Sequence, residues 1–233
     1  MDAAEECVRK ETESTRNTMS EIKQIDYKDH WNKIYSKSEI NKLVWHEESP
    51  KPSLDLIKKC NLNSDAVILD VGSGATTLIE HLIKECYNNI VAADISDVAL
   101  QKAKEKLKQE EAELVKWIVD DTTNPNFINQ LDSVDLWHDR TVLHFLTKKE
   151  QRQGYLSTLN NLVKPDGYAI IAVFSVDGAK KCSGLDIVNY DHKMIAEFLG
   201  NQFKLIKHFT YIYIQPSGDE RPYVYTLFQR IRN

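Results

Sequence analysis

Short apolar stretches alternate with amphipathic stretches between residues 66 and 174 of the chain. The apolar stretches are "AVILDV", "NIVAAD", "ELVKWIV", "SVDLWHD" and "YAIIAVFS". A continuous apolar run is typical of a strand that is covered on both faces of a parallel sheet. The alternation predicts right-handed βαβ units, so we expect an α/β, Rossmann-like fold with a mostly parallel sheet and helices on both faces.

The C-terminal part of the chain breaks this alternation. The segments "FKLIKHFTYIYI" and "PYVYTLFQRI" both favour strands, and no helical stretch separates them. We therefore predict an antiparallel hairpin at one edge of the sheet.

The length and composition suit one domain. With 233 residues, 42% of them hydrophobic, the chain can bury a core of ordinary size. We expect a single domain over residues 24–233, in which residues 24–62 form a helical cap before the first strand. The polar start "MDAAEECVRKETESTRNTMSEIKQ" predicts a flexible tail over residues 1–23, and it lacks the apolar segment of a signal peptide.

Charge and cysteine content disfavour several classes of function. The net charge is -5 and no Lys/Arg block stands out, so we expect no nucleic-acid partner. No apolar run approaches the roughly 20 residues of a membrane span. The cysteines Cys7, Cys60, Cys86 and Cys182 lie far apart, without metal-ligand spacing. This pattern predicts reduced thiols, a cytoplasmic location and no metal site.

The turn "DVGSGATT", which follows the first apolar strand, indicates a ligand site. A P-loop would need a lysine near the second glycine, and the turn has none. A dinucleotide fingerprint has the pattern G-x-G-x-x-G. Gly72 and Gly74 match its first two glycines, but Thr77 occupies the position of the third. A nicotinamide-dependent oxidoreductase is therefore disfavoured.

Three carboxylates at successive strand ends indicate a ligand other than a phosphate or a dinucleotide. Asp70, inside the turn, would repel a pyrophosphate and attract an ammonium group. Asp94 ends the second strand, where a carboxylate can accept both hydroxyls of a ribose. Asp121 follows the third strand and could accept a hydrogen bond from an adenine amino group. The expected ligand thus has a cationic amino-acid end, a ribose and an adenine, and S-adenosylmethionine fits this description.

These motifs resemble those of the class I S-adenosylmethionine-dependent methyltransferases. The similarity covers about residues 66–174 and rests on "ILDVGSG", "AADIS", "VDDTT" and "LVKPDGYAIIAVF". It implies a seven-stranded sheet with a reversed last strand. It also implies a set of cofactor contacts, to which the N-terminal aromatic residues discussed below are added. The full set is Trp31, Tyr35, Trp45, Asp70, Gly72, Ser73, Gly74, Asp94, Ile95, Asp120, Asp121 and Thr122.

The segment "LWHDRTVLHFL" after the fourth strand is the expected acceptor side. His138 is the candidate general base because its ordinary pKa lies near neutrality; the alternative is a histidine that is hydrogen-bonded within the turn. "WHDR" is similar to the "WDR" of thiopurine-type methyltransferases. We expect substrate contacts from Trp137 and Arg140, and from Cys182 in a loop after the fifth strand. Arg140 could instead pair with Asp139 or with the N-terminal segment.

The N-terminal stretches "HWNKIY" and "LVWHEES" resemble segments that precede the fold in some small-molecule and lysine methyltransferases. This resemblance implies that Trp31, Tyr35 and Trp45 close over the cofactor. The sequence thus predicts a methyltransferase that acts on a small molecule. A lysine-type protein methyltransferase is the alternative, and a catalytically silent cofactor-binding partner protein remains open. The oligomeric state is not predicted.

Overall fold

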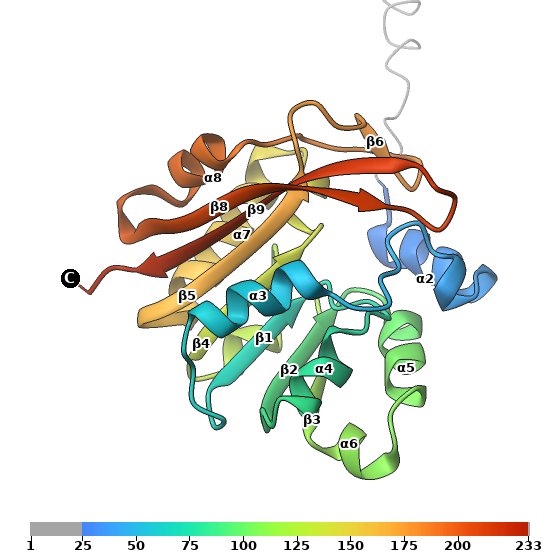
Figure 1. Cartoon of the computed structure of the whole chain (residues 1–233), viewed down its shortest axis with the longest axis horizontal. Helices are drawn as coiled ribbons and strands as arrows, with labels where there is room; N and C mark the ends of the chain where they lie inside the picture. Colours follow the sequence, from blue (N-terminus) through green and yellow to red (C-terminus); the bar gives the residue numbers. More distant parts are fainter. Residues whose placement is uncertain (1–24, 233) are drawn as a thin grey trace, which may run out of the picture.

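A seven-stranded sheet with the order β3-β2-β1-β4-β5-β9-β8 forms the centre of the structure (Figure 1). The computed structural model describes residues 25–232, so the predicted tail over residues 1–23 lies outside the described residues. The strands are β1 (Val67–Val71), β2 (Asn89–Asp94), β3 (Val115–Val119), β4 (Val134–Arg140), β5 (Val163–Phe174), β8 (Phe203–Ile214) and β9 (Glu220–Arg230). The strands β1 to β5 pair in parallel, whereas β9 runs antiparallel to both β5 and β8. The predicted mixed sheet with a C-terminal edge hairpin is confirmed.

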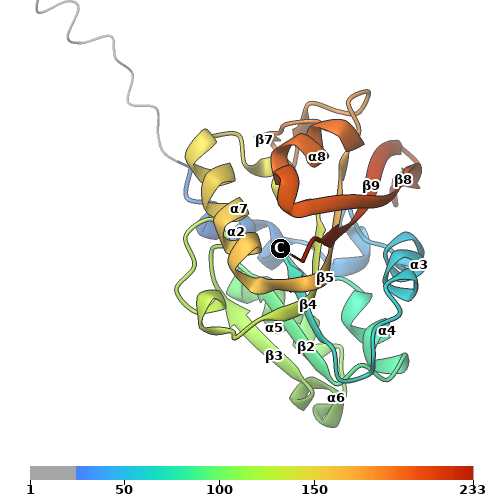
Figure 2. The ribbon, with the colours of Figure 1, turned by 90° about the vertical axis from the view of Figure 1, so that its left-hand side faces the viewer.

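Helices cover both faces of this sheet. Figure 2 shows α7 and α8 on one side, and α3 and α4 on the other. The helices are α2 (Tyr27–Lys37), α3 (Lys51–Lys59), α4 (Leu78–Lys84), α5 (Asp97–Glu105), α6 (Gln109–Glu113), α7 (Lys149–Leu162) and α8 (His192–Leu199). Short 3-10 turns are η1 (Ile40–Lys42), η2 (Ile128–Gln130), η3 (Leu143–Phe145) and η4 (Gly200–Gln202), and a small hairpin consists of β6 (Lys181–Cys182) and β7 (Leu185–Asp186).

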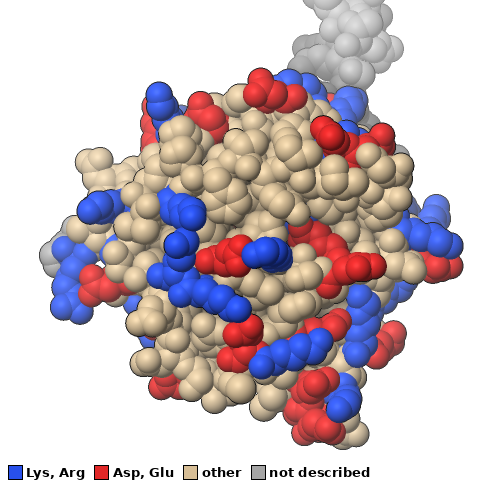
Figure 3. All heavy atoms as spheres, in the orientation of Figure 1, with Lys and Arg blue, Asp and Glu red and all other residues tan. Residues whose placement is uncertain are grey.

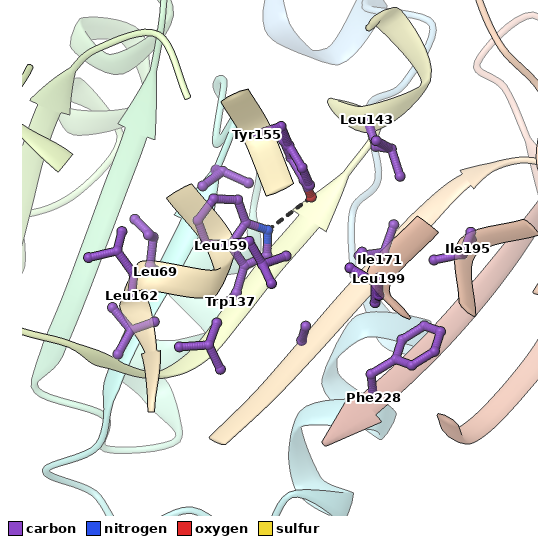
Figure 4. Close-up of a cluster of buried hydrophobic side chains, with 14 of the residues drawn as sticks. Leu69, Trp137, Leu143, Tyr155, Leu159, Leu162, Ile171, Ile195, Leu199 and Phe228 are labelled. Atoms are coloured by element: carbon purple, nitrogen blue, oxygen red, sulfur yellow. Dashed lines mark hydrogen bonds between the residues drawn. The ribbon is translucent and has the colours of Figure 1, made fainter. Parts of the chain in front are cut away.

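The strand side chains divide between two cores. Leu69, Trp137 and Ile171 pack with residues of α7 and α8 (Figure 4), whereas Leu136 and other side chains of opposite orientation pack with α3 and α4. Successive residues of a strand point to opposite faces, so an apolar strand residue is buried whichever way it points. Each fully buried Leu or Ile stabilises the fold by about 1.5–3 kcal/mol.

The N-terminal segment that was predicted to be a cap has two parts. Asn32 in α2 donates from Nδ2 to Asp97 Oδ1 over 2.9 Å and accepts from Ser96 Oγ over 2.6 Å, which ties α2 to the start of α5. In contrast, α3 lies against the sheet and buries Leu56 and Ile57. Only the part before α3 therefore reaches the carboxyl ends of the strands.

The stretch "SDVALQKAKEKLKQE" over residues 96–110 predicts one helix with Ser96 as its N-cap, but the structure divides this stretch between α5 and α6. Ser96 caps α5 by accepting from the Ala99 backbone N–H over 3.1 Å. The chain then turns at Leu107, which packs against the core on the α4 side, and Glu111 accepts from the Lys108 backbone N–H over 3.0 Å to begin α6. Core packing and a new cap therefore end the helix earlier than periodicity indicates.

Two features of the described residues bear on possible partners. None of the helices over residues 25–232 is long and apolar enough to cross a membrane. On the face drawn in Figure 3, Lys and Arg side chains lie among Asp and Glu side chains rather than in one basic field. The absence of a nucleic-acid partner stays a prediction.

Candidate functional site

A pocket lies at the carboxyl ends of the parallel strands, which is where open α/β sheets bind ligands. Most of the predicted site residues line it: Trp31, Tyr35, Trp45, Gly72, Asp94, Ile95, Asp120, Asp121, Thr122, Arg140 and Cys182. The others do not line it: Asp70, Ser73, Gly74, Trp137 and His138. The pocket thus combines side chains from the β2–β3 half of the sheet, from the β4–β5–β9 half and from the N-terminal segment.

The turn between β1 and α4 needs its two glycines for conformation and for space. Gly72 and Gly74 have φ angles of 60° and 56°, in the left-handed region that glycine adopts without strain. A Cβ atom on Gly72 would overlap the side chain of Val142, and one on Gly74 would overlap the hydroxyl of Tyr35. The turn is therefore held close beneath the residues that cover it.

Asp94, the last residue of β2, organises the next turn and also faces the pocket. Its carboxylate accepts from the Gly74 backbone N–H over 2.8 Å and from the Ser96 N–H over 2.7 Å. Burial raises the pKa of the Asp94 carboxyl to about 6, although both N–H groups act in the opposite direction. A carboxylate has about four acceptor positions, so Asp94 can still accept hydroxyl groups from a ligand.

Asp120 and Asp121 both line the pocket but differ in their partners. The Asp120 carboxylate accepts from the backbone N–H groups of Asn126, Phe127 and Ile128 over 2.7–3.0 Å, so it shapes the loop after β3. Asp121 accepts from the N–H and the hydroxyl of Thr123, each over 2.8 Å and each through its Oδ1 atom. Asp121 is therefore the better candidate for an adenine contact, and this role stays a prediction.

Aromatic side chains from the N-terminal segment roof the pocket. Trp31 meets Trp45 edge-to-face, with ring centroids 5.7 Å apart, and meets Phe145 of η3 at 5.0 Å. Tyr35 packs against Trp45 at 5.7 Å. Edge-to-face pairs add about 0.5–1.5 kcal/mol each beyond area burial, so this roof is a packed structure. Its place fits the expectation that Trp31, Tyr35 and Trp45 close over a ligand.

Arg140, the last residue of β4, pairs with the N-terminal segment, which was one of the two expected arrangements. Its Nε atom lies 3.1 Å from Glu47 Oε2 and donates to the Tyr225 hydroxyl over 3.3 Å, and its Nη1 atom donates to the Trp45 carbonyl over 3.2 Å. Burial raises the pKa of the Glu47 carboxyl, while Arg140 lowers it. Arg140 thus joins the roof to the sheet.

Trp137 and Asp139 point to the opposite face of β4. Trp137 is fully buried, and its Nε1 atom donates to the Tyr155 hydroxyl over 3.0 Å (Figure 4). Tyr155 in turn donates to Asp139 Oδ2 over 2.6 Å. Burial raises the pKa of Asp139 to about 6. The expected acceptor contact of Trp137 has no support in this geometry, because the side chain belongs to the core beneath α7.

His138 is buried away from the pocket. Its Nδ1 atom lies 2.6 Å from Asp70 Oδ1 and its Nε2 atom lies 2.9 Å from Ser53 Oγ. With both ring nitrogens engaged and 3% of the residue exposed, His138 has no free atom for an acceptor proton. The structure therefore favours the alternative of a histidine hydrogen-bonded within the fold, and it offers no support for the expected general base.

Several pocket residues, among them Thr76, Phe174 and Tyr223, were not predicted from the sequence. Thr76 has a buried hydroxyl without a partner among the described residues. Phe174, at the end of β5, could be identified from its strand-end position, whereas Tyr223 in β9 becomes a pocket residue only through the antiparallel pairing with β5. Cys182 reaches the pocket from the β6–β7 hairpin, and burial raises the pKa of its thiol.

The described residues offer no obvious metal site. Over residues 25–232, no group of three or more His, Cys, Asp or Glu side chains is placed to hold a metal ion. Cys60, Cys86 and Cys182 are free thiols.

Comparisons with known proteins agree with this architecture. Residues 68–167 match a family model described as a methyltransferase domain. The chain is 22% identical over 157 residues to EEF1A lysine methyltransferase 2 of Danio rerio; the match covers 62% of this chain and 66% of the relative, so it spans about two thirds of that protein's length.

Two solved structures share the fold. The S-adenosylmethionine-dependent methyltransferase of Anabaena variabilis is 13% identical, with a TM-score of 0.70 over 88% of this chain and 93% of that one. The 1,6-didemethyltoxoflavin-N1-methyltransferase of Burkholderia thailandensis, solved with S-adenosylhomocysteine, is 19% identical, with a TM-score of 0.61 over 78% of each chain. At these identities the likeness concerns the fold.

Proposed function

Because the chain belongs to the class I S-adenosylmethionine-dependent methyltransferases, we propose that it transfers the methyl group of this cofactor to a small-molecule acceptor in the pocket described above. One observation carries the proposal. The pocket runs from the carboxylates at the ends of β2 and β3 to a buried cation at the end of β4, beneath the aromatic roof. It therefore has one half suited to the cofactor and another half suited to an acceptor.

The residues of the first half fit the cofactor. Asp94 and Asp121 both line the pocket; Asp94 can accept both ribose hydroxyls, and Asp121 can accept from the adenine amino group. The hydroxyl of Thr76, which has no partner among the described residues, can make a further polar contact, and Gly72 also lines the pocket in its left-handed conformation. When bound, the cofactor supplies a methyl group on a sulfonium sulfur. The acceptor would attack the methyl carbon in line, and the sulfur would leave as S-adenosylhomocysteine.

The residues of the second half align the acceptor. The described carboxylates that line the pocket, Asp94, Asp120 and Asp121, all belong to the cofactor half, and no described lining residue is a histidine. Arg140 and Cys182 instead face this half, together with the aromatic walls. Positioning of the acceptor, rather than proton removal by a dedicated base, is therefore the main task of these side chains.

The experiment is methyl transfer from radiolabelled S-adenosylmethionine into a cell extract, followed by separation by size. The proposal predicts label in the small-molecule fraction, and less of it with the Asp94→Ala variant than with the wild-type chain. Cofactor binding without label in that fraction would contradict a small-molecule acceptor.

A protein acceptor is the second candidate because of one observation, the similarity to relatives named as EEF1A lysine methyltransferase 2. Label on a protein band in the same extract, released as methyllysine after hydrolysis, would replace the small-molecule proposal by this one.

A further inference from the structure

Arg140 has a buried nitrogen without a hydrogen-bond partner. Its Nε and Nη1 atoms are bound by Glu47, Tyr225 and the Trp45 carbonyl, whereas no described residue accepts from Nη2. The residue is 8% exposed and lines the pocket. Buried donors are almost always satisfied, because an unmade bond to a charged group costs more than a neutral one. A buried guanidinium nitrogen without an acceptor, on a residue that lines a pocket, therefore indicates that a ligand supplies the acceptor atom.

The guanidinium group is fixed in place before any ligand arrives. Its central carbon lies 5.4 Å from the ring centroid of Tyr213 and 5.2 Å from that of Tyr223. These cation–π contacts and the bonds to Glu47 restrict its rotation. A ligand that binds to Nη2 therefore loses little affinity to ordering of this side chain.

The sheet order places Arg140 away from the predicted ribose and adenine contacts. Asp94 ends β2 and Asp121 follows β3, whereas Arg140 ends β4 on the other side of β1. Neighbouring strands are about 4.8 Å apart, so about 10 Å separates the ends of β2 and β4. Phe174 of β5 and Tyr223 of β9 are among the other pocket residues on this side. Arg140 is thus the charged group of the acceptor half.

We propose that Arg140 binds an anionic group of the methyl acceptor, which makes the acceptor class a small molecule that carries a carboxylate or a similar anion beside the methylated atom. This inference rests on the proposed function and specifies its substrate class. The planar guanidinium matches a carboxylate oxygen, and the walls of Phe174 and Tyr223 suit an apolar or aromatic body. A lysine ammonium would instead have to enter beside an existing cation.

Substitutions of Glu47 and of Arg140 should have opposite effects on the binding of an anion, which makes the proposal testable. Its carboxylate is the anion that already faces Arg140, so an anionic ligand is repelled by Glu47 while it is attracted by the guanidinium. Arg140→Gln should therefore weaken binding of an anion, and Glu47→Gln should strengthen it. A merely structural role of the pair would make both variants change binding in the same direction.

The test measures binding of benzoate and of the neutral benzyl alcohol to the complex with S-adenosylhomocysteine, by titration calorimetry. We expect the wild-type complex to prefer benzoate by about tenfold or more. Arg140→Gln should abolish the preference and Glu47→Gln should enlarge it. Arg232→Gln, which removes an exposed arginine charge far from the pocket, should leave it unchanged.

Three results would overturn the inference. One is a wild-type complex that does not prefer benzoate. Another is a preference for benzoate that survives Arg140→Gln in a folded variant. If the Arg140→Gln variant does not fold, the Glu47→Gln variant replaces it, and an unchanged preference for benzoate in that variant would overturn the inference. The last is a loss of S-adenosylhomocysteine affinity in Arg140→Gln, which would assign Nη2 to the amino-acid carboxylate of the cofactor. If S-adenosylhomocysteine itself does not bind to the wild-type chain, the proposed function fails instead.

Discussion

His138 and Asp70 form a buried pair at neighbouring positions of β4 and β1, with Nδ1 and Oδ1 2.6 Å apart. Their side chains are 3% and 4% exposed. Ser53 Oγ lies 2.9 Å from the second ring nitrogen of His138, so the pair also connects α3 with the two strands. A carboxylate accepts hydrogen bonds, and Nδ1 is therefore the donor in this pair. The arrangement stabilises the base of the glycine turn rather than the surface of the pocket.

The first prediction concerns this pair. We expect His138→Leu to lower the free energy of unfolding by about 3–5 kcal/mol, because it leaves the Asp70 carboxylate buried without its partner. Ser53→Ala removes one hydrogen bond of the same ring and should cost about 1 kcal/mol. Urea denaturation measures both variants. If His138→Leu were as stable as the wild-type chain but had lost turnover, His138 would return as the candidate base.

The second prediction concerns the ribose contact. Asp94→Ala should weaken binding of S-adenosylhomocysteine by about 2–3 kcal/mol, because it removes charge-assisted bonds to the ribose hydroxyls. Calorimetric titration measures the affinity, and a circular dichroism spectrum checks the fold. Asp132→Ala, which removes an exposed carboxylate in the loop before β4, is the matched control. Equal affinities of a folded Asp94→Ala variant and the wild-type chain would remove this assignment.

The third prediction follows from the raised pKa of Asp94, about 6. The ribose hydroxyls bind to the ionised carboxylate, so affinity for S-adenosylhomocysteine should fall as the pH is lowered through about 6, by up to about tenfold per pH unit. Titrations between about pH 5 and 8 measure this. The Asn side chain of Asp94→Asn cannot ionise, so the affinity of this variant should depend less on pH. If the affinity of the variant depended on pH as strongly as that of the wild-type chain, Asp94 would be excluded as the cause.

The same pKa acts in the opposite direction on the stability of the ligand-free chain. Its value in the fold lies above the ordinary 3.8, so the fold binds protons more tightly than the unfolded chain does. The stability that Asp94 contributes is therefore fully present below about 3.8 and is lost as the pH rises through about 6. Asp139, whose pKa is also raised to about 6, contributes with the same sign.

The fourth prediction concerns a glycine inside α7. A Cβ atom on Gly154 would overlap the backbone carbonyl of Thr123, in the loop that carries Asp121. Gly154→Ala should therefore destabilise the fold by about 1–3 kcal/mol, although alanine is the better helix former. Gln153→Ala, one position away and exposed, is the control and should be nearly neutral. Thermal denaturation measures both, and a stabilised Gly154→Ala variant would show that the contact is absent.

The strand ends could be predicted from the sequence, and the orientation of each side chain along β4 could not. Gly72, Asp94 and Asp121 follow apolar strands, and parallel strands bring such positions to one edge whatever the details of packing. In β4, however, side chains alternate between faces, so Trp137 points into the core when Arg140 reaches the pocket. The prediction placed both at the acceptor because it considered the strand end as a whole.

Contacts between distant segments account for the rest. The pairing of Arg140 with Glu47 depends on where the chain before α3 returns to the sheet. Tyr223 faces the pocket because β9 inserts between β5 and β8. The sequence left the partner of Arg140 open between Asp139 and the N-terminal segment, and it gave no signal for Tyr223, because both relations arise when separate elements pack together.

A crystal structure of the chain with S-adenosylhomocysteine tests the central claim most directly. The account predicts the ribose hydroxyls within hydrogen-bond distance of Asp94, the adenine beside Asp121, and the sulfur directed toward Arg140 beneath Trp31 and Trp45. A ligand bound elsewhere, or a ribose that does not contact Asp94, would contradict it.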